Sequence, residues 1–315
     1  MLSISEINQW RENGYVVVKN LLDKEILSNS IEFLHNLYNS KELGIRDFGS
    51  DGKLEFPSNT DLDYLSMDEN LIRCVQQLLG CYEITLLQCD TWGKKGSTDF
   101  SEQSNNDQRM HMDYGNNTFV HPSDWYNPEA VAAIIYLSNV SKTEGGTSVV
   151  PRTDFTHKYY NFPYVNMPGI NGHKFINNKN DAEDYFLRSH KDIYDFRNEL
   201  YKNEIIIKPN IGDILFYRLD IWHRGTPVKE NEVRFVTNLL WKKRECYWIN
   251  NWNPGWTRKM YYGPVEKLFI NLSPLQRSLL NVPLPGDKYW TKEKLELFRI
   301  RYPGIDILPY LKLIE

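Results

Sequence analysis

A histidine and an aspartate separated by one residue, His111 and Asp113, restrict the fold of this chain more than any other feature. Alternate residues of a β-strand project to the same side, so a strand through this pair offers two ligands to one metal ion. Residues 114–117 follow directly and have the composition of a turn. Because a surface histidine beside an acid has the same spacing, a metal site needs a third ligand.

His223 is the third candidate ligand. It follows the apolar residues 214–217 and precedes a Gly/Pro turn at residues 225–227. Two histidines and one carboxylate on one face of a metal ion are the ligand set of the non-heme Fe(II) oxygenases, which leaves three positions open. His121 is the strongest alternative ligand, but it has no carboxylate two residues away and ends no predicted strand.

Arg234 lies 11 residues after His223 (234 − 223 = 11) and opens an apolar strand predicted over residues 235–241. A guanidinium presents a planar fork of donors that binds a carboxylate through two hydrogen bonds. The sequence therefore predicts a site in which a metal ion and a carboxylate bind side by side.

With these residues identified, the chain resembles the phytanoyl-CoA dioxygenase family of Fe(II)/2-oxoglutarate-dependent oxygenases. The resemblance rests on the four residues above and on a β-rich stretch over residues 136–151. It implies a mainly β fold with flanking helices around a double-stranded β-helix core of the jelly-roll, cupin-like kind. It also implies that His111, Asp113 and His223 bind Fe(II), with 2-oxoglutarate and O2 as co-substrates.

The sequence departs from the family in one place. Many members have Pro-Gly-Ser-His after the Gly-Gly turn, whereas Pro-Arg-Thr-Asp follows Val150 here, which predicts a different entrance to the site. Relatives that halogenate carry Gly or Ala at the carboxylate position, and Asp113 fills that position in this chain. The resemblance therefore implies hydroxylation, radical desaturation or ring closure at an unactivated C–H bond, with release of succinate and CO2.

The resemblance also assigns roles in co-substrate and substrate binding. It places the far carboxylate of 2-oxoglutarate on Arg234. From their positions in the sequence, Thr226 or Lys94 is expected to add a hydrogen bond. A mixture of aromatic and cationic groups at the pocket mouth suits a small polar or carboxylate-bearing metabolite, as in natural product biosynthesis. The candidate substrate residues are Arg109, Trp92, Trp125, Tyr217 and Arg218. Either of these arginines, taken alone, is better explained as one partner of a surface ion pair.

Three other functions remain open at this stage. The sequence is compatible with hydroxylation of fatty acyl-CoA or carrier-tethered substrates, although no segment indicates a CoA or carrier-protein site. It is also compatible with a hydroxylase of protein side chains, which an open groove would favour over a deep pocket. A catalytically silent β-helix that serves as a binding module is the third, and the retained triad with Arg234 argues against it.

The length of 315 residues and the 41% hydrophobic content allow a large core, and no linker divides the chain. We therefore predict one oxygenase domain over residues 1–315. Residues 1–80 supply helical and strand support, and residues 81–245 form the β-helix core. Within that core the aromatic-rich residues 152–203 are a lid insertion with helix over residues 181–200, and residues 246–315 are an aromatic C-terminal wrap.

Local signals locate several elements. Ser3 and Glu6 form a capping box for a short helix that Gly14 ends, Asp23 caps a longer helix, and Gly80 closes a third. Residues 130–137 are almost entirely apolar, which is typical of a strand buried on both faces. Residues 84–92, 147–150 and 214–218 also predict strands, the last of which leads to His223.

Composition limits the partners and the compartment. A net charge of −4 leaves no basic face for a phosphate backbone, so nucleic acid is not the expected partner. The four cysteines show no Cys-x-x-Cys spacing and predict reduced thiols in the cytoplasm. No run of about 18 apolar residues is present, which predicts no membrane span. The expected partner is a small-molecule substrate, and the sequence leaves open whether the chain is a monomer or a dimer.

Overall fold

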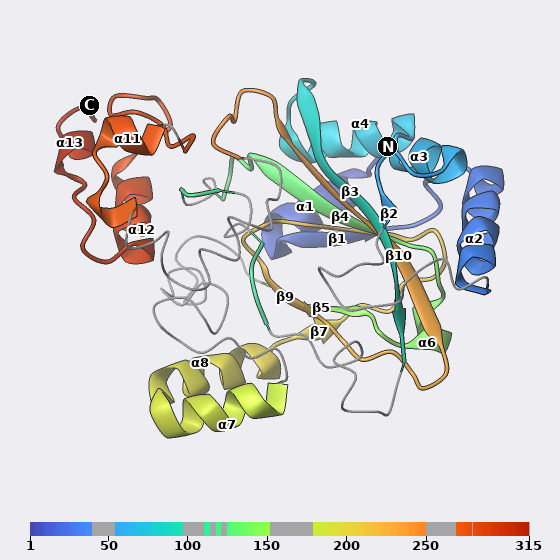
Figure 1. The fold of residues 1–315 in the computed structure, drawn as a ribbon. Coiled ribbons are helices and arrows are strands. Elements are labelled where there is room, and N and C mark those ends of the chain that lie inside the picture. Colours follow the sequence, from blue (N-terminus) through green and yellow to red (C-terminus); the bar gives the residue numbers. More distant parts are fainter. Residues whose placement is uncertain are drawn as a thin grey trace.

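The computed structural model describes residues 1–39, 54–96, 110–113, 118–120, 125–151, 179–249, 269–278 and 280–314. In these ranges two antiparallel sheets occupy the centre and helices flank them (Figure 1). The larger sheet has the order β1-β8-β4-β10-β3-β2 and the smaller sheet has the order β7-β5-β9. The expectation of a mainly β architecture with flanking helices is confirmed.

The strands of the larger sheet are β1 (Tyr15–Val18), β2 (Leu54–Glu55), β3 (Ile84–Lys95), β4 (Ala130–Tyr136), β8 (Ile214–Tyr217) and β10 (Val233–Lys243). Those of the smaller sheet are β5 (Thr147–Val150), β7 (Ile205–Ile206) and β9 (Trp222–Gly225). The two longest strands, β3 and β10, pair over almost their full lengths with a register shift between Leu240 and Trp241.

The central strand β4 is buried along its whole length, as its apolar sequence predicts. Val131, Ala133 and Ile135 join the apolar layer under the N-terminal helices. Ala132 and Ile134 point the other way and join the layer between the two sheets. A strand that separates two apolar layers needs apolar residues at every position, because alternation would bury a polar group in one of them.

The N-terminal helices are α1 (Ile4–Asn13), α2 (Lys24–Asn39), α3 (Thr60–Ser66) and α4 (Glu69–Leu79). The predicted capping box of α1 is present, with the Ser3 side chain accepting from the Glu6 amide and the Glu6 side chain accepting from the Ser3 amide. Gly14 ends the helix at a φ of 81°, a left-handed conformation that glycine adopts without steric cost. Together the four helices cover the outer face of the larger sheet.

The remaining helices are α6 (Val140–Thr143), α7 (Lys179–Ser189), α8 (Lys191–Lys202), α11 (Pro274–Ser278), α12 (Lys292–Arg301) and α13 (Leu308–Leu311). The helix predicted over residues 181–200 is therefore two helices, which meet near His190. Residues 152–178 of the predicted lid lie outside the described residues. No helix in the described ranges is long and apolar enough to cross a bilayer.

Two of these helices contact the short segments that surround the candidate metal ligands. From α12, Arg301 Nη1 donates to the carbonyl oxygen of Val120 at 2.7 Å, and the Tyr302 hydroxyl at its C-terminus donates to the Phe119 carbonyl oxygen at 2.6 Å. From α8, the Tyr201 hydroxyl accepts from the amide of Met110 at 3.4 Å. Helices distant in sequence thus brace the chain on both sides of residues 111–113.

Candidate metal centre

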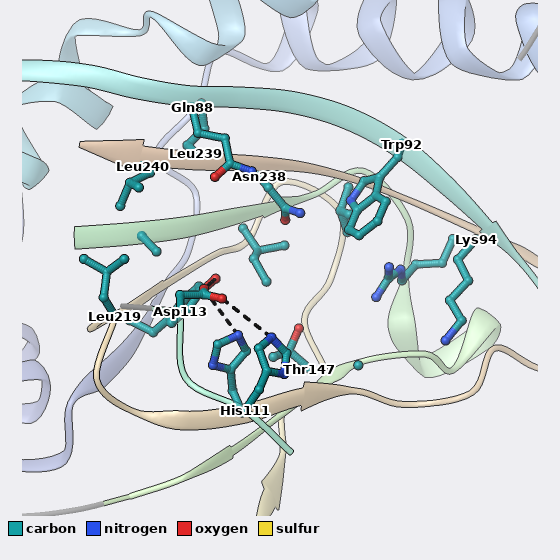
Figure 2. A pocket seen from close by; sticks show the side chains of 17 residues that line it. Gln88, Trp92, Lys94, His111, Asp113, Thr147, Leu219, Asn238, Leu239 and Leu240 are labelled. Carbon is teal, nitrogen blue, oxygen red and sulfur yellow. Dashed lines mark hydrogen bonds and ion pairs between the residues drawn. The ribbon is translucent and has the colours of Figure 1, made fainter. Parts of the chain in front are cut away.

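A cavity lies on the inner face of the larger sheet, where alternate residues of β3 and β10 point into it (Figure 2). It encloses about 810 Å³ when its open mouth is included. Its described lining residues are Gln88, Trp92, Lys94, His111, Asp113, Ala132, Ile134, Thr147, Tyr217, Leu219, His223, Gly225, Arg234, Val236, Asn238, Leu239 and Leu240.

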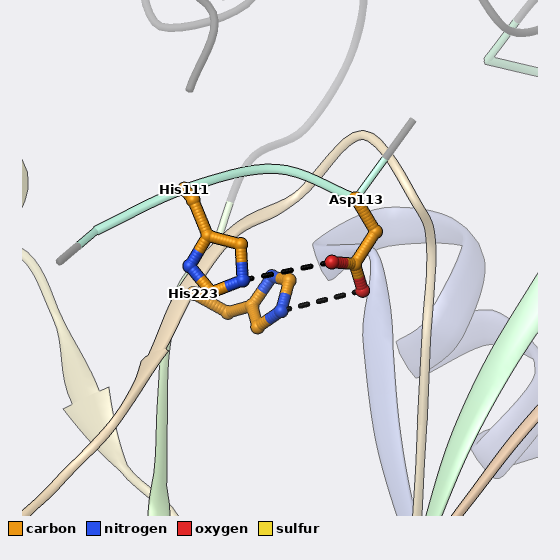
Figure 3. A group of neighbouring side chains, drawn as sticks. All are labelled: His111, Asp113 and His223. Carbon is orange, nitrogen blue, oxygen red and sulfur yellow. Dashed lines mark ion pairs between the residues drawn. The ribbon is translucent and has the colours of Figure 1, made fainter. Parts of the chain in front are cut away.

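His111 and His223 are held together by their own backbones. The His111 amide donates to the His223 carbonyl oxygen at 2.9 Å, and the His223 amide donates to the His111 carbonyl oxygen at 2.8 Å. This isolated antiparallel bridge replaces the longer strand that was predicted through residues 111–113. The two imidazole rings lie 4.3 Å apart between centroids (Figure 3). The pairing therefore brings together two histidines that are 112 positions apart (223 − 111 = 112).

Asp113 faces both histidines. Its Oδ1 lies 3.5 Å from His111 Nε2, and its Oδ2 lies 3.4 Å from His223 Nε2 (Figure 3). The Asp113 amide donates to the Leu219 carbonyl oxygen at 2.9 Å, and the Tyr217 hydroxyl donates to Asp113 Oδ2 at 2.9 Å. The side chain is therefore fixed by the end of β8, and the backbone by the loop between β8 and β9.

The charge state of the cluster suits a metal ion. Burial raises the pKa of Asp113, but the two histidines and the Tyr217 hydroxyl outweigh burial and hold that pKa well below its usual range. Burial lowers the pKa of His223 to about 4, an effect that His111 reinforces and Asp113 opposes. At neutral pH the carboxylate is ionised and the His223 imidazole is neutral, which are the forms that bind metals.

The orientation of the His223 ring is set by a backbone carbonyl group on the side away from Asp113. Its Nδ1 lies 3.1 Å from the carbonyl oxygen of Ile221, so an Nδ1–H donates to that oxygen and the Nε2 lone pair faces Asp113. A metal-binding histidine usually gives its second nitrogen to such a partner, which fixes both tautomer and ring.

The donor atoms fit a single ion. One donor from each of the three residues lies within 4.8 Å of the others. Nitrogen and oxygen donors that lie about 2.1 Å from one ion, at angles of about 90° to 110°, are separated by about 3.0–3.4 Å. The separations of 3.4 and 3.5 Å to Asp113 are close to that range. Two imidazoles and one carboxylate on one side of the ion match the non-heme Fe(II) donor set.

Two cationic side chains occupy one end of the cavity. Lys94 and Arg234 face each other across β3 and β10, and both are buried. Lys94 Nζ donates to the Thr226 carbonyl oxygen at 3.3 Å, and Arg234 Nη1 donates to the Gly145 carbonyl oxygen at 2.6 Å. Two buried cations on neighbouring strands make this end electropositive, so it suits a carboxylate.

The structure separates the other predicted residues into two groups. Trp92 and Tyr217 line the cavity, and Tyr217 also contacts Asp113. The Thr226 hydroxyl instead donates to the Gly146 carbonyl oxygen at 2.8 Å, and the described cavity lining does not include it. Arg109 and the alternative ligand His121 lie outside the described residues.

Arg218 and Trp125 also lie away from the described lining of the cavity. Arg218 is 2% exposed, and it pairs with Asp220 through Nε at 2.9 Å and Nη2 at 3.0 Å. Its guanidinium carbon lies 4.2 Å from the centre of the Trp125 ring. The pair is therefore buried and braces the loop that holds Asp113, which differs from both roles that the sequence suggested for Arg218.

Several cavity residues were not predicted from the sequence, among them Gln88, Thr147 and Asn238. A signal for Asn238 exists, because it follows Arg234 by four residues on one strand and so projects to the same side. On β3, Gln88, Trp92 and Lys94 are separated by even numbers of residues, so their side chains also project to one side. The contact between Tyr217 and Asp113 has no such signal, because it depends on how the loop after β8 folds back.

Replacing Tyr217 with phenylalanine is expected to weaken Fe(II) binding about tenfold without unfolding the protein. The phenol donates to Asp113 Oδ2, and loss of a hydrogen bond to a metal ligand typically costs 10- to 100-fold in metal affinity. Competition with a coloured chelator measures the change. Tyr247→Phe is the matched control, because it removes a hydroxyl that donates to Asp287 on the surface. Equal affinities in the two variants would contradict the role of Tyr217.

Comparison with known proteins identifies the fold. No family model matches the sequence, and no curated protein matches it at a significant level. Among solved structures, the α-ketoglutarate-dependent carbocyclase SnoK from nogalamycin biosynthesis is similar at 14% identity and a TM-score of 0.56, over 81% of this chain and 89% of that one. HygX from Streptomyces hygroscopicus, solved with nickel and 2-oxoglutarate, is similar at 13% identity and a TM-score of 0.52, over 80% of this chain and 90% of that one. EctD from S. alaskensis is similar at 12% identity and a TM-score of 0.52, over 81% of this chain and 83% of that one. The chain therefore has the fold of these proteins.

Proposed function

We propose that this protein is an Fe(II)/2-oxoglutarate-dependent non-heme dioxygenase, related to the phytanoyl-CoA dioxygenase family, whose two sheets form a double-stranded β-helix. The observation that carries the proposal is the convergence of His111, Asp113 and His223 in a cavity that ends in two buried cations. The shared fold of SnoK and HygX supports it, since one is described as α-ketoglutarate-dependent and the other was solved with 2-oxoglutarate bound.

In this proposal His111, Asp113 and His223 hold Fe(II), and Arg234 and Lys94 bind the far carboxylate of 2-oxoglutarate. With O2, these groups supply the oxidation of an unactivated C–H bond, and succinate and CO2 leave. The Thr226 carbonyl oxygen orients the Lys94 ammonium, which is the part that Thr226 plays in co-substrate binding.

The chain contributes positioning and exclusion of water. The Tyr217 hydroxyl holds Asp113 Oδ2, and the Ile221 carbonyl oxygen holds His223 Nδ1, so both ligands are oriented before the metal binds. Ala132, Ile134 and Val236 form an apolar wall that keeps water from the reacting carbon. Asp113 completes the carboxylate position, which favours transfer of oxygen, desaturation or ring closure over halogenation.

The substrate is a small polar or carboxylate-bearing metabolite, as in natural product biosynthesis. Two structures with this fold support a small molecule: the epimerase SnoN was solved with nogalamycin RO, and HygX was solved with hygromycin B. The cavity on the inner face of the larger sheet also fits a small molecule, because its lining combines apolar side chains with a few polar groups.

Anaerobic addition of Fe(II) and 2-oxoglutarate to the purified protein tests the proposal. We expect a visible metal-to-ligand charge-transfer band that neither component gives alone, because the band requires a 2-oxo acid chelated to iron. Admission of O2 is then expected to release succinate slowly, and a suitable substrate accelerates that release. A folded protein that binds Fe(II) but shows no band with 2-oxoglutarate would contradict the proposed function.

A further inference from the structure

The end of the cavity away from Lys94 is lined by amides and aliphatic side chains. Gln88, Asn238 and Leu240 lie there or next to it, and Leu219 lies beside Asp113 and His111 on the opposite wall (Figure 2). None of the described lining residues at this end carries a positive charge. This end therefore differs in chemistry from the cationic end that suits a carboxylate.

Asn238 belongs to the row of β10 residues that face the cavity. Arg234, Val236, Asn238 and Leu240 alternate along the strand, and all four line the cavity. Four residues of a strand span about 13 Å, so Asn238 lies well along β10 from the arginine. A five-carbon diacid that is anchored at Arg234 and reaches the triad leaves the Asn238 end to another molecule.

The Asn238 side chain has an unused acceptor. Its Oδ1 is buried, and no donor in the described part of the chain reaches it. A buried acceptor left unpaired is unfavourable because it has lost its hydrogen bonds to water, so a ligand that supplies a donor relieves part of that penalty. The neighbouring Gln88 is oriented by the bond from its Nε2 to Asp90 Oδ2 at 2.9 Å, and its Oε1 is not among the buried unpaired atoms of the described residues. Asn238 is thus the amide at this end with a buried oxygen that lacks a donor within the described ranges.

We propose that Asn238 determines substrate specificity by accepting a hydrogen bond from a hydroxyl group on an uncharged part of the substrate. The proposal rests on the proposed function and deepens it. Leu219 and Leu240 contact the carbon skeleton around that hydroxyl, and the absence of a cation among the described residues at this end disfavours a carboxylate there. The part of the substrate that binds at this end is therefore uncharged, carries a hydroxyl group and has an apolar face.

Two ring-sized probes test this class. The protein is loaded with 2-oxoglutarate and with Mn(II) in place of Fe(II), so that the metal relaxes the protons of any molecule bound beside it. We expect trans-1,2-cyclohexanediol to bind at least about fivefold more tightly than cyclohexanecarboxylate, since one hydrogen bond contributes about 1 kcal/mol. Tighter binding of the carboxylate, or no binding of the diol, overturns the proposal.

Asn238→Leu removes the acceptor at similar size. The diol is expected to lose about fivefold or more in affinity, whereas the affinity for 2-oxoglutarate stays within about twofold. Asn29→Leu, which alters an exposed residue on α2, is the matched control and leaves both affinities unchanged. An unaltered diol affinity in Asn238→Leu overturns the proposal. So does an equal loss for 2-oxoglutarate, which would assign Asn238 to the co-substrate.

The Fe(II) charge-transfer band separates this inference from the proposed function. A missing band in the natural protein refutes the function, whereas a normal band with no discrimination between the probes refutes only the role of Asn238. If Asn238→Leu does not fold, Asn238→Ser, which keeps an acceptor oxygen, is expected to retain diol binding and the preference over the carboxylate. Loss of that preference in Asn238→Ser counts against the proposal.

Discussion

Replacing His223 with alanine is expected to abolish the charge-transfer band of the Fe(II)/2-oxoglutarate complex and to weaken Fe(II) binding more than about 100-fold. Loss of a mere hydrogen bond to a ligand already costs 10- to 100-fold, and the ligand itself contributes more. His223 Nε2 lies 3.4 Å from Asp113 Oδ2, so its removal leaves two donors on one side of the ion. Anaerobic titration with Fe(II), followed by absorbance, measures both changes.

The matched control for this variant is His35→Ala. His35 is exposed on α2, where its ring contacts the edge of Phe235, so the substitution removes an imidazole without touching the cavity. This control is expected to keep the band and the iron affinity of the natural protein. If His223→Ala keeps the band while its folding is unchanged, His223 is not a ligand, and the metal site must be built from other residues.

The parts of the fold that the sequence predicted are those set by local chemistry. The α1 capping box needs only Ser3 and Glu6, and its end needs only a glycine that tolerates positive φ. The burial of β4 on both faces follows from a run that is almost entirely apolar. These features depend on neighbours in the chain, so they can be derived before any tertiary contact is known.

The candidate site was predictable for a different reason. His111 and Asp113 are two residues apart, and the structure keeps them on one side although the strand shortens to a single bridge. What could not be derived is the convergence with His223, because a bridge between positions 112 apart depends on the register of the whole fold. The resemblance to a known family supplied that step, and composition or periodicity did not.

Arg218 has a structural setting that the sequence did not predict. A cation near a predicted metal ligand suggested either a substrate contact or a surface ion pair, yet the residue is buried against Asp220 and Trp125. The signal was present, since an acid two residues away lies within reach of a long side chain. Its burial, however, follows from packing against Trp10 and Trp125, which are distant in sequence. Packing between residues that are distant in sequence cannot be predicted from the pattern of neighbouring residues.

Replacing Arg234 with alanine is expected to weaken 2-oxoglutarate binding more than tenfold, about 1.4 kcal/mol, while Fe(II) binding is unchanged. Arg234 is 7% exposed and faces Lys94 across the β3–β10 pair, so the two cations share one carboxylate in the proposed complex. A charge-assisted hydrogen bond contributes about 1.5–3 kcal/mol, and Lys94 retains part of the attraction in the variant. Titration of the charge-transfer band with 2-oxoglutarate gives the affinity.

A second co-substrate makes this test specific for the far carboxylate. 2-Oxopentanoate chelates iron as 2-oxoglutarate does but carries a methyl group in place of that carboxylate. The natural protein is expected to prefer 2-oxoglutarate by more than about tenfold, and Arg234→Ala should lose most of the preference because 2-oxopentanoate never used the arginine. Arg73→Ala, at an exposed arginine of α4, should retain the preference. If Arg234→Ala discriminates between the two acids as well as the natural protein does, the carboxylate binds elsewhere, and the cationic end of the cavity serves the substrate instead.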